Sequence, residues 1–320
     1  MVSRILVTGG AGFVGRHLVA ALAARNPDSD IIVGVYDEYP QFSGDRVRTV
    51  SFDILNADHV TAVVRAEKPT HLVHLAAYSD VASSHHHIRG TWAVNLDGTL
   101  NVALAIMEAA PECRLIYCSS SEVYGRSFLA GRPLDETALL EPNNPYGASK
   151  AAADVMVGQM VQQGLRAVRV RPFNHTGPGQ SVNFVIPAFA AQIARIERGA
   201  QPPTISVGNL SSQRDFLDVG DVVDAYCSIV ARFDAMPPNC VMNLASGQPV
   251  SIADILKMLV SQSSIKIEIV QDPARARSSD TPIAVGDASL ARKLLEWEPR
   301  AELSSTLASV LTYYRSLDSI

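Results

Sequence analysis

The sequence lacks a long hydrophobic run, a run of basic residues and any Cys-x-x-Cys pair. No window holds the roughly 18 consecutive apolar residues of a membrane-spanning helix, and the short apolar stretch at the N-terminus enters a glycine turn, unlike a signal peptide. The 27 Lys and Arg against 32 Asp and Glu give a net charge of −5, without a basic cluster for nucleic acid. The four cysteines stand far apart, which favours reduced thiols. We therefore expect a cytoplasmic protein that binds neither nucleic acid nor membranes.

The first half of the chain alternates short β-rich runs with longer helical patterns, as repeated βαβ units around a parallel sheet do. Several runs are apolar on both faces, which is expected when helices cover both sides of the sheet. The predicted strands are Arg4–Thr8, Ile31–Tyr36, Thr49–Phe52, His71–Leu75, Arg114–Cys118 and Val168–Arg171. The sequence therefore predicts an α/β fold with a doubly wound parallel sheet (Rossmann fold).

Beyond Pro172, prolines punctuate shorter elements and the regular alternation is lost. We expect residues 1–172 to form an NAD(P)-binding Rossmann domain, to which segments around 211–245 return. Residues 173–320 are expected to form mainly a smaller, interleaved substrate lobe.

A glycine-rich turn stands between the first predicted strand and an amphipathic helical pattern. Its glycines satisfy both Gly-x-Gly-x-x-Gly and the wider Gly-x-x-Gly-x-x-Gly spacing. Glycine permits a tight turn and close approach of the backbone to a pyrophosphate, and the amides at the start of a helix attract its charge. The cofactor-binding candidates here are Gly9, Gly12, Phe13, Val14 and Gly15.

Two carboxylates follow later predicted strands. Asp37 stands 22 residues after Gly15, where it can accept hydrogen bonds from the adenosine ribose. Because this charge would repel a 2′-phosphate, NAD(H) is favoured as cofactor and NADP(H) stays possible. Asp53 and Ile54 could contact the adenine, although an ordinary strand-end aspartate explains that spacing equally well.

Tyr146 and Lys150 stand four residues apart on a helix that Asn144-Pro145 is expected to begin, so they share a face. An ammonium so placed stabilises tyrosinate, and together with a positively charged nicotinamide nearby it is expected to bring the pKa of the phenol toward the working pH. Upstream, a serine run follows a predicted strand at the sheet edge where such folds bind ligands. A single Tyr-x-x-x-Lys is more often an exposed pair, but the combination favours an active site.

Together these motifs resemble the extended short-chain dehydrogenase/reductase family, in its nucleotide-sugar branch. The residues that carry the resemblance are Thr8 to Gly15, His74-Leu75-Ala76-Ala77, Ser120-x-x-Val123-Tyr124-Gly125 and Tyr146-x-x-x-Lys150. The resemblance implies that Ser120 is the catalytic hydroxyl, with Tyr146 and Lys150 as its partners. It also implies that Leu75, Ala76 and Ala77 contact the cofactor, as Tyr146 and Lys150 do, the latter through the nicotinamide ribose. A helix-mediated homodimer is common in the family.

The C-terminal half resembles the members of this branch that act on GDP-sugars. The matching stretches are Arg171 to Gln180, Asn183-Phe184-Val185, Val207 to Leu210, Arg214-Asp215-Phe216 and Asp272 to Asp280. The resemblance assigns Asn174, Arg214 and Arg277 to the nucleotide diphosphate, Asp280 to its ribose and Ser79 to the hexose. Val185, Asn209 and Ser120 complete the substrate-binding candidates. For any one arginine, an ordinary ion pair remains an alternative.

The implied reaction is NAD(P)H-dependent reduction of a nucleotide-linked 4-keto-6-deoxyhexose, as in the conversion of GDP-4-keto-6-deoxy-D-mannose to GDP-D-rhamnose. Glu122 leaves a second reading open, because a glutamate at this place removes a proton from the sugar in the branch's 4,6-dehydratases. A 4-epimerase with retained NAD is also possible, and a non-catalytic dinucleotide sensor is a remote alternative.

Three consecutive histidines, His85 to His87, invite a metal-site interpretation. Neighbouring residues point about 100° apart on a helix and to opposite faces of a strand, so the three cannot simply converge on one ion. We therefore expect no metal site.

Overall fold

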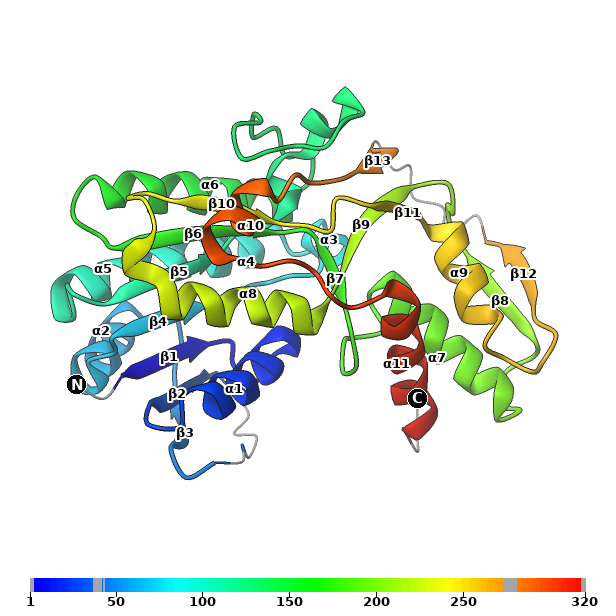
Figure 1. Cartoon of the computed structure of the whole chain (residues 1–320), viewed down its shortest axis with the longest axis horizontal. Helices are drawn as coiled ribbons and strands as arrows, with labels where there is room; N and C mark the ends of the chain where they lie inside the picture. The colour runs from blue at the N-terminus through cyan, green and yellow to red at the C-terminus, as the bar shows by residue number, and fades with distance from the viewer. Residues whose placement is uncertain (1–2, 37–41, 43, 273–280, 318–320) are drawn as a thin grey trace.

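A computed structural model describes residues 3–36, 42, 44–272 and 281–317. Its main feature is a parallel sheet of seven strands in the order β10-β6-β5-β4-β1-β2-β3 (Figure 1). These strands are β1 (Arg4–Thr8), β2 (Asp30–Val35), β3 (Val47–Ser51), β4 (His71–His74), β5 (Arg114–Cys118), β6 (Ala167–Pro172) and β10 (Val241–Leu244). The predicted doubly wound α/β fold is confirmed, and the boundaries of the predicted strands agree with the structure to within two residues.

The alternation of side chains along each strand feeds two separate hydrophobic cores. In β1, Ile5 and Val7 face one core while Leu6 faces the other, and in β2 Ile32 joins Leu6. All four are at most 1% exposed. Because both faces of the strands are buried, the strand sequences are apolar throughout.

Helices cover both faces of the sheet and connect its strands. The first core takes side chains from α1 (Phe13–Arg25), α8 (Val219–Arg232) and α10 (Ser289–Leu295). The second takes them from α2 (Ala57–Glu67), α5 (Gly98–Ala109) and α6 (Pro145–Val161). The short helices α3 (Val81–Ser84) and α4 (Ile88–Trp92) lead through a π-helical turn, η1 (Ala93–Asp97), into α5.

The start of α6 follows the sequence prediction. The Asn144 side-chain oxygen accepts a hydrogen bond of 2.7 Å from the Gly147 amide, and Pro145 occupies the first helical turn. A proline there loses no hydrogen bond, because that amide has no partner within a helix. The helix that carries Tyr146 and Lys150 therefore begins at a fixed place.

The smaller lobe lies to one side of the sheet, at the right of Figure 1. Its hydrophobic core is formed mainly by α7 (Val185–Glu197), α9 (Ile252–Val260) and α11 (Leu303–Ser316). Its strands are β7 (Asn174–Thr176), β8 (Thr204–Val207), β9 (Gln213–Asp218), β11 (Pro249–Ser251), β12 (Glu268–Gln271) and β13 (Ile283–Ala284).

The chain passes between the sheet and the smaller lobe more than once. Within the segment 211–245, β9 pairs with β7, β11 and β13 outside the large sheet, whereas α8 and β10 return to the large sheet. The division of the chain near residue 172 stays a prediction. None of the helices in the described part of the chain combines the length and apolar character needed to cross a bilayer.

Candidate active site

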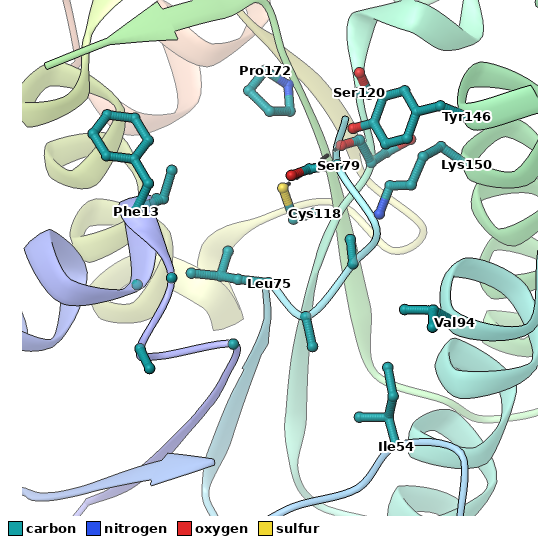
Figure 2. Close-up of a pocket in the computed structure, with 18 of the residues that line it drawn as sticks. Phe13, Ile54, Leu75, Ser79, Val94, Cys118, Ser120, Tyr146, Lys150 and Pro172 are labelled. Carbon is teal, nitrogen blue, oxygen red and sulfur yellow. Dashed lines mark hydrogen bonds between the residues drawn. The ribbon is translucent and has the colours of Figure 1, made fainter. Parts of the chain in front are cut away.

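A cavity of about 610 Å³ lies at the carboxyl ends of the central strands (Figure 2). Many of the sequence-predicted residues line it: Gly9, Gly12, Phe13, Val14, Gly15, Asp53, Ile54, Leu75, Ala76, Ala77, Ser79, Ser120, Glu122, Tyr146, Lys150 and Asn174. They come from elements far apart in the sequence. The fold thus brings the predicted cofactor turn and the predicted catalytic residues to one cavity.

The glycine turn is too tight for side chains at two of its positions. Gly9 has a φ of +66°, and a Cβ on it would lie 2.7 Å from the Ala76 nitrogen. A Cβ on Gly15 would lie 2.3 Å from the Gly9 oxygen. No side chain caps the start of α1. Because the cavity is bordered by bare backbone at a helix N-terminus, it fits a pyrophosphate, the central group of a dinucleotide.

A buried histidine connects the turn to the neighbouring strand. His74 lies between the Thr8 and Thr99 hydroxyls, at 2.7 and 3.1 Å from its two ring nitrogens. Burial, together with the charge of Lys150, lowers the pKa of His74 to about 3, so the ring is neutral. Thr8 also accepts a hydrogen bond from the Ala76 amide, which fixes the loop that contains Leu75 and Ala77.

Ser120, Tyr146 and Lys150 lie on one side of the cavity (Figure 2). Ser120 follows β5 and begins the short helix η2 (Ser121–Val123), where its hydroxyl accepts a hydrogen bond of 3.1 Å from the Glu122 amide. The Ser120 side chain also hydrogen-bonds Tyr146. Lys150, one helical turn further along α6, is only 2% exposed and its Nζ lies 4.5 Å from the centroid of the Tyr117 ring.

Burial raises the pKa of the Tyr146 phenol, and the charges of Cys118 and Glu122 raise it further, while the Ser120 hydrogen bond lowers it. In the protein without ligands, desolvation of the phenolate therefore has the largest effect on the pKa of Tyr146. The expected lowering, which depends on a positively charged nicotinamide as well as on Lys150, stays a prediction. Burial also lowers the pKa of Lys150, against the opposing charges of Cys118 and Asp154. At neutral pH the phenol is protonated and can act as a proton donor.

Asp154, which was not singled out in the sequence, helps to fix the helix that carries Tyr146 and Lys150. It is fully buried on α6, one turn after Lys150, and forms ion pairs with Arg169 at 2.8 Å and Arg171 at 3.0 Å. Arg171 also donates a hydrogen bond of 3.1 Å to the Tyr124 hydroxyl. The ion pairs connect α6 to β6. An aspartate four residues after the lysine was the available signal.

Other residues that line the cavity were given no role from the sequence. Among them are Tyr36 and Phe52 at the strand ends, and Phe173, His175, Gln180 and Phe184 after β6, the last four within stretches that match the GDP-sugar members. The ring of His175 stacks on that of Phe13, with centroids 6.2 Å apart. For Tyr36 and Phe52 the only available signal was their position at the ends of predicted strands.

The predicted substrate residues are not all gathered at this cavity. Val185, at the start of α7, Asn209 and Arg214 lie outside its lining. Arg214, on β9, donates hydrogen bonds of 2.8 and 3.0 Å to the Gln213 and Thr281 carbonyls. Burial lowers its pKa, while Glu122 raises it. Three other predicted residues, Asp37, Arg277 and Asp280, lie outside the described residues.

The three histidines are exposed around the junction of α3 and α4, where the His87 ring lies 6.2 Å from that of Tyr78. Within the described ranges, no three potential metal ligands gather at one point.

A dinucleotide-type turn and a Ser-Tyr-Lys group at the same edge of a doubly wound sheet are the features of a short-chain dehydrogenase/reductase. Comparisons with known proteins agree. A family model described as GDP-mannose 4,6 dehydratase matches residues 6–310. The chain is 33% identical to the GDP-6-deoxy-D-mannose reductase of Pseudomonas aeruginosa, over 99% of this chain and 98% of that protein.

Solved structures give the same result. The structure of RMD from Pseudomonas aeruginosa complexed with NADPH matches with a TM-score of 0.84 and 31% identity, covering 99% of this chain and 100% of that one. The UDP-glucose 4-epimerase of Thermus thermophilus, in complex with NAD, matches with a TM-score of 0.85 and 26% identity, over 98% and 99% of the two chains.

The chain therefore belongs to the GDP-mannose 4,6-dehydratase family, within the extended short-chain dehydrogenases/reductases that act on nucleotide sugars. This confirms the resemblance drawn from the sequence and makes the chain an enzyme of that type.

Proposed function

We propose that this enzyme uses a reduced nicotinamide dinucleotide to reduce the keto group of a nucleotide-linked 4-keto-6-deoxyhexose. The substrate we propose is GDP-4-keto-6-deoxy-D-mannose, and the product GDP-D-rhamnose. One observation carries the proposal: Ser120, Tyr146 and Lys150 line one side of the cavity of which the glycine turn forms another part, and burial raises the pKa of the Tyr146 phenol (Figure 2). Reduction of a ketone requires a proton donor at this place. The 33% identity to a GDP-6-deoxy-D-mannose reductase supports the choice of substrate.

Each catalytic residue has a role that follows from its position. Tyr146 donates a proton to the C4 oxygen as negative charge develops there, and Ser120 orients that oxygen by a hydrogen bond. Lys150 supplies a fixed positive charge one helical turn away, and Asp154 holds α6 in place through its two arginines. Because Lys150 is buried, its charge is weakly screened.

The cofactor proposal rests on the glycine turn and the cavity beside it. Gly9, Gly12, Phe13, Val14 and Gly15 would hold the pyrophosphate, Asp53 and Ile54 the adenine, and Leu75 to Ala77 the middle of the dinucleotide. Tyr146 and Lys150 would contact the nicotinamide end. The chemistry that a reduced nicotinamide supplies when bound is hydride donation to C4. The similar structures were solved with NADPH and with NAD. We expect NADH to be preferred because Asp37 would repel a 2′-phosphate.

The direct test mixes the protein, NADH or NADPH, and GDP-4-keto-6-deoxy-D-mannose, and follows loss of reduced-nicotinamide absorbance. We expect one cofactor to be oxidised for each sugar reduced, with GDP-D-rhamnose as the product identified by NMR. The matched UDP- and dTDP-linked 4-keto-6-deoxyhexoses test which nucleotide the enzyme requires. Failure to oxidise either cofactor with any of these sugars would reject the reductase.

A 4,6-dehydratase is the second candidate, because Glu122 lies beside Ser120. A dehydratase, like a 4-epimerase, regenerates its NAD within each cycle and therefore oxidises no added NADH. Incubation with GDP-mannose or an unmodified UDP-hexose separates the readings. Conversion of these sugars by protein carrying endogenous NAD, without added cofactor, would favour this alternative.

A homodimer is part of the proposal. Leu104 on α5 and Val155 on α6 are 50% and 58% exposed, and both helices pack over the same face of the sheet. Exposed apolar side chains on adjacent helices favour association with a second copy. Sedimentation should give a dimer, and Leu104→Glu with Val155→Glu should give a monomer. Leu139→Glu, at a 72% exposed leucine elsewhere, serves as the control.

A cytoplasmic location of the protein stays a prediction.

A further inference from the structure

Lys150 is a buried cation whose partner is an aromatic ring. Its side chain extends from α6 toward the cavity (Figure 2) and is only 2% exposed. Among the residues that the structure describes, no carboxylate lies within 4 Å of its Nζ and no group hydrogen-bonds it. Nζ lies instead 4.5 Å from the centroid of the Tyr117 ring. Because the face of an aromatic ring carries partial negative charge, this is a cation–π contact.

The Tyr117 ring is held by the sheet beneath it. Tyr117 lies on β5 in register with His74 on β4 and Arg169 on β6, and side chains in register on neighbouring strands point to the same face. The His74 ring lies 6.1 Å from the Tyr117 ring. Both residues are at most 1% exposed. The ring that faces Lys150 therefore belongs to the packed core and has a fixed position.

The Tyr117 hydroxyl does not explain why a tyrosine stands at this place. In the described part of the chain it forms no hydrogen bond of ordinary geometry, although Thr99 lies near it. A buried hydroxyl without a partner lowers the stability of the fold. The contribution of Tyr117 at this place therefore comes from its ring.

Other ionisable groups lie near Lys150. Asp154, one turn further along α6, is already paired with two arginines, and Cys118 lines the cavity beside Tyr117. Burial lowers the pKa of Lys150, and the charges of these two groups oppose this effect. His74 is neutral, because burial lowers its pKa to about 3. The ring of Tyr117 is thus the direct contact that stabilises the ammonium.

We propose that Tyr117 is a positioning residue, whose ring face keeps the Lys150 ammonium charged and directed into the cavity, where it can bind the hydroxyls of the nicotinamide ribose. The inference rests on the proposed role of Lys150 in cofactor binding. A carboxylate at this place would cancel the charge, and an aliphatic side chain would leave a buried charge without a partner. A ring face stabilises the ammonium and leaves its N–H groups available to a ligand.

Fluorination of the ring tests the contact with little change in its shape. Tyr117→Phe, followed by mono-, di- and trifluorinated phenylalanines at the same position, keeps the ring while fluorine withdraws electron density from its face. Carbon-13 NMR of lysine-labelled protein without cofactor follows the Lys150 titration, and Lys150→Met identifies its signal among the five lysines. We expect the Lys150 pKa to stay in place in Tyr117→Phe. With the trifluorinated ring it should fall by about half a pH unit, a roughly threefold change in the protonation equilibrium.

Calorimetric titration with NADH provides the second measurement. We expect the affinity to be unchanged in Tyr117→Phe and to fall about threefold across the fluorinated series, because the ammonium is held less firmly. The same series at Phe189, a 5% exposed ring in the core of the smaller lobe, is the matched control. It should change neither the Lys150 pKa nor the affinity for NADH.

Three results would overturn the inference. The first is a Lys150 pKa that stays in place across the series at position 117. The second is an equal movement in the Phe189 series, which would indicate a general effect of fluorinated cores. The third is unchanged NADH affinity despite a moved pKa, which would show that the ring does not direct the ammonium to the cofactor. Neither measurement needs a sugar, so both decide the role of Tyr117 whether or not the reductase proposal holds.

Discussion

The cofactor side and the sugar side of this active site differ in what they are made of. The cofactor side consists of backbone turns at the ends of buried strands, with the tight contact of Gly15 against Gly9 as its clearest case. The proposed sugar side uses side chains from separate elements, such as Asn174 on β7 and Arg214 on β9. A site made of backbone depends on a short stretch of sequence, whereas a site made of distant side chains depends on the whole fold.

This difference has a consequence for how each side can vary. A glycine turn accepts few substitutions, because an added carbon atom meets backbone within 3 Å. Side chains on the smaller lobe can change singly without disturbing the sheet. We therefore expect changes on the cofactor side to affect stability and binding together, and changes on the sugar side to affect recognition alone. The following predictions test that expectation.

The largest effect is expected on turnover, when Tyr146 is changed, because we propose that Tyr146 contacts both the cofactor and the sugar. Tyr146→Phe removes the proton donor but keeps the ring, so turnover should fall by about 10³-fold, within the range for general acid catalysis. Cofactor affinity, measured by fluorescence titration, should change little. Tyr313→Phe on α11 is the control and should retain activity. Turnover within a few-fold of normal would remove Tyr146 from the mechanism.

The second largest effect is expected on stability, when the buried ion pairs of Asp154 with Arg169 and Arg171 are broken. Burial alone would raise the pKa of Asp154, but the hydrogen bond and charge of Arg171, together with Arg169, hold it below its ordinary value. Asp154→Asn should lower the free energy of unfolding by about 3 kcal/mol, because two arginines lose their partner. Urea unfolding measures it.

The sign of the pH dependence follows from that lowered pKa. The stabilisation by Asp154 is complete above the ordinary carboxyl pKa and is lost as the pH falls through the folded-state value. The difference in the free energy of unfolding between the unmodified protein and Asp154→Asn should therefore become smaller at acidic pH. Asp224→Asn breaks an exposed pair with Arg25 and should cost less than about 1 kcal/mol. Equal losses of unfolding free energy in Asp154→Asn and Asp224→Asn would show that the buried ion pairs of Asp154 do not stabilise the protein more than an exposed pair.

On the cofactor side, Gly15→Ala should weaken dinucleotide binding at least about tenfold and destabilise the protein by about 2 kcal/mol, because the new methyl meets Gly9 and Gly10. Gly90→Ala is the matched control, since nothing lies within 4 Å of a Cβ there. Calorimetric titration and thermal melting measure the two effects. A Gly15→Ala protein with normal affinity would show that the turn does not hold the cofactor.

The smallest effect is expected on the sugar side. Arg214→Lys should raise the KM for the nucleotide sugar by about fivefold while leaving cofactor affinity unchanged, because lysine cannot reproduce the planar hydrogen bonds of a guanidinium. Arg65→Lys, at an exposed pair with Glu108, serves as the control. A change in cofactor affinity but not in KM would reverse the proposed division of the site.

The same contrast explains which parts could be predicted from the sequence. The sheet and the helix start at Asn144 followed from local patterns, because strand periodicity and a helix cap depend on neighbouring residues. Asp154 was missed because its partners, Arg169 and Arg171, lie on another element. The raised pKa of Tyr146 in the protein without ligands could not be predicted from spacing, which indicates the nearby ammonium but not the degree of burial. The predicted substrate residues came from the family resemblance, which names residues but does not say how their side chains are arranged around one cavity.

The pairing of β10 with β6 has a consequence for how the protein is made. During synthesis, one edge of β6 has no paired strand until the residues of β10, 241–244, have been synthesised. A fragment stopped at residue 172 would leave that edge open to pairing with other chains. The large sheet is therefore expected to be complete only after the first part of the smaller lobe, from β7 to β9, has been synthesised, which couples the folding of the two.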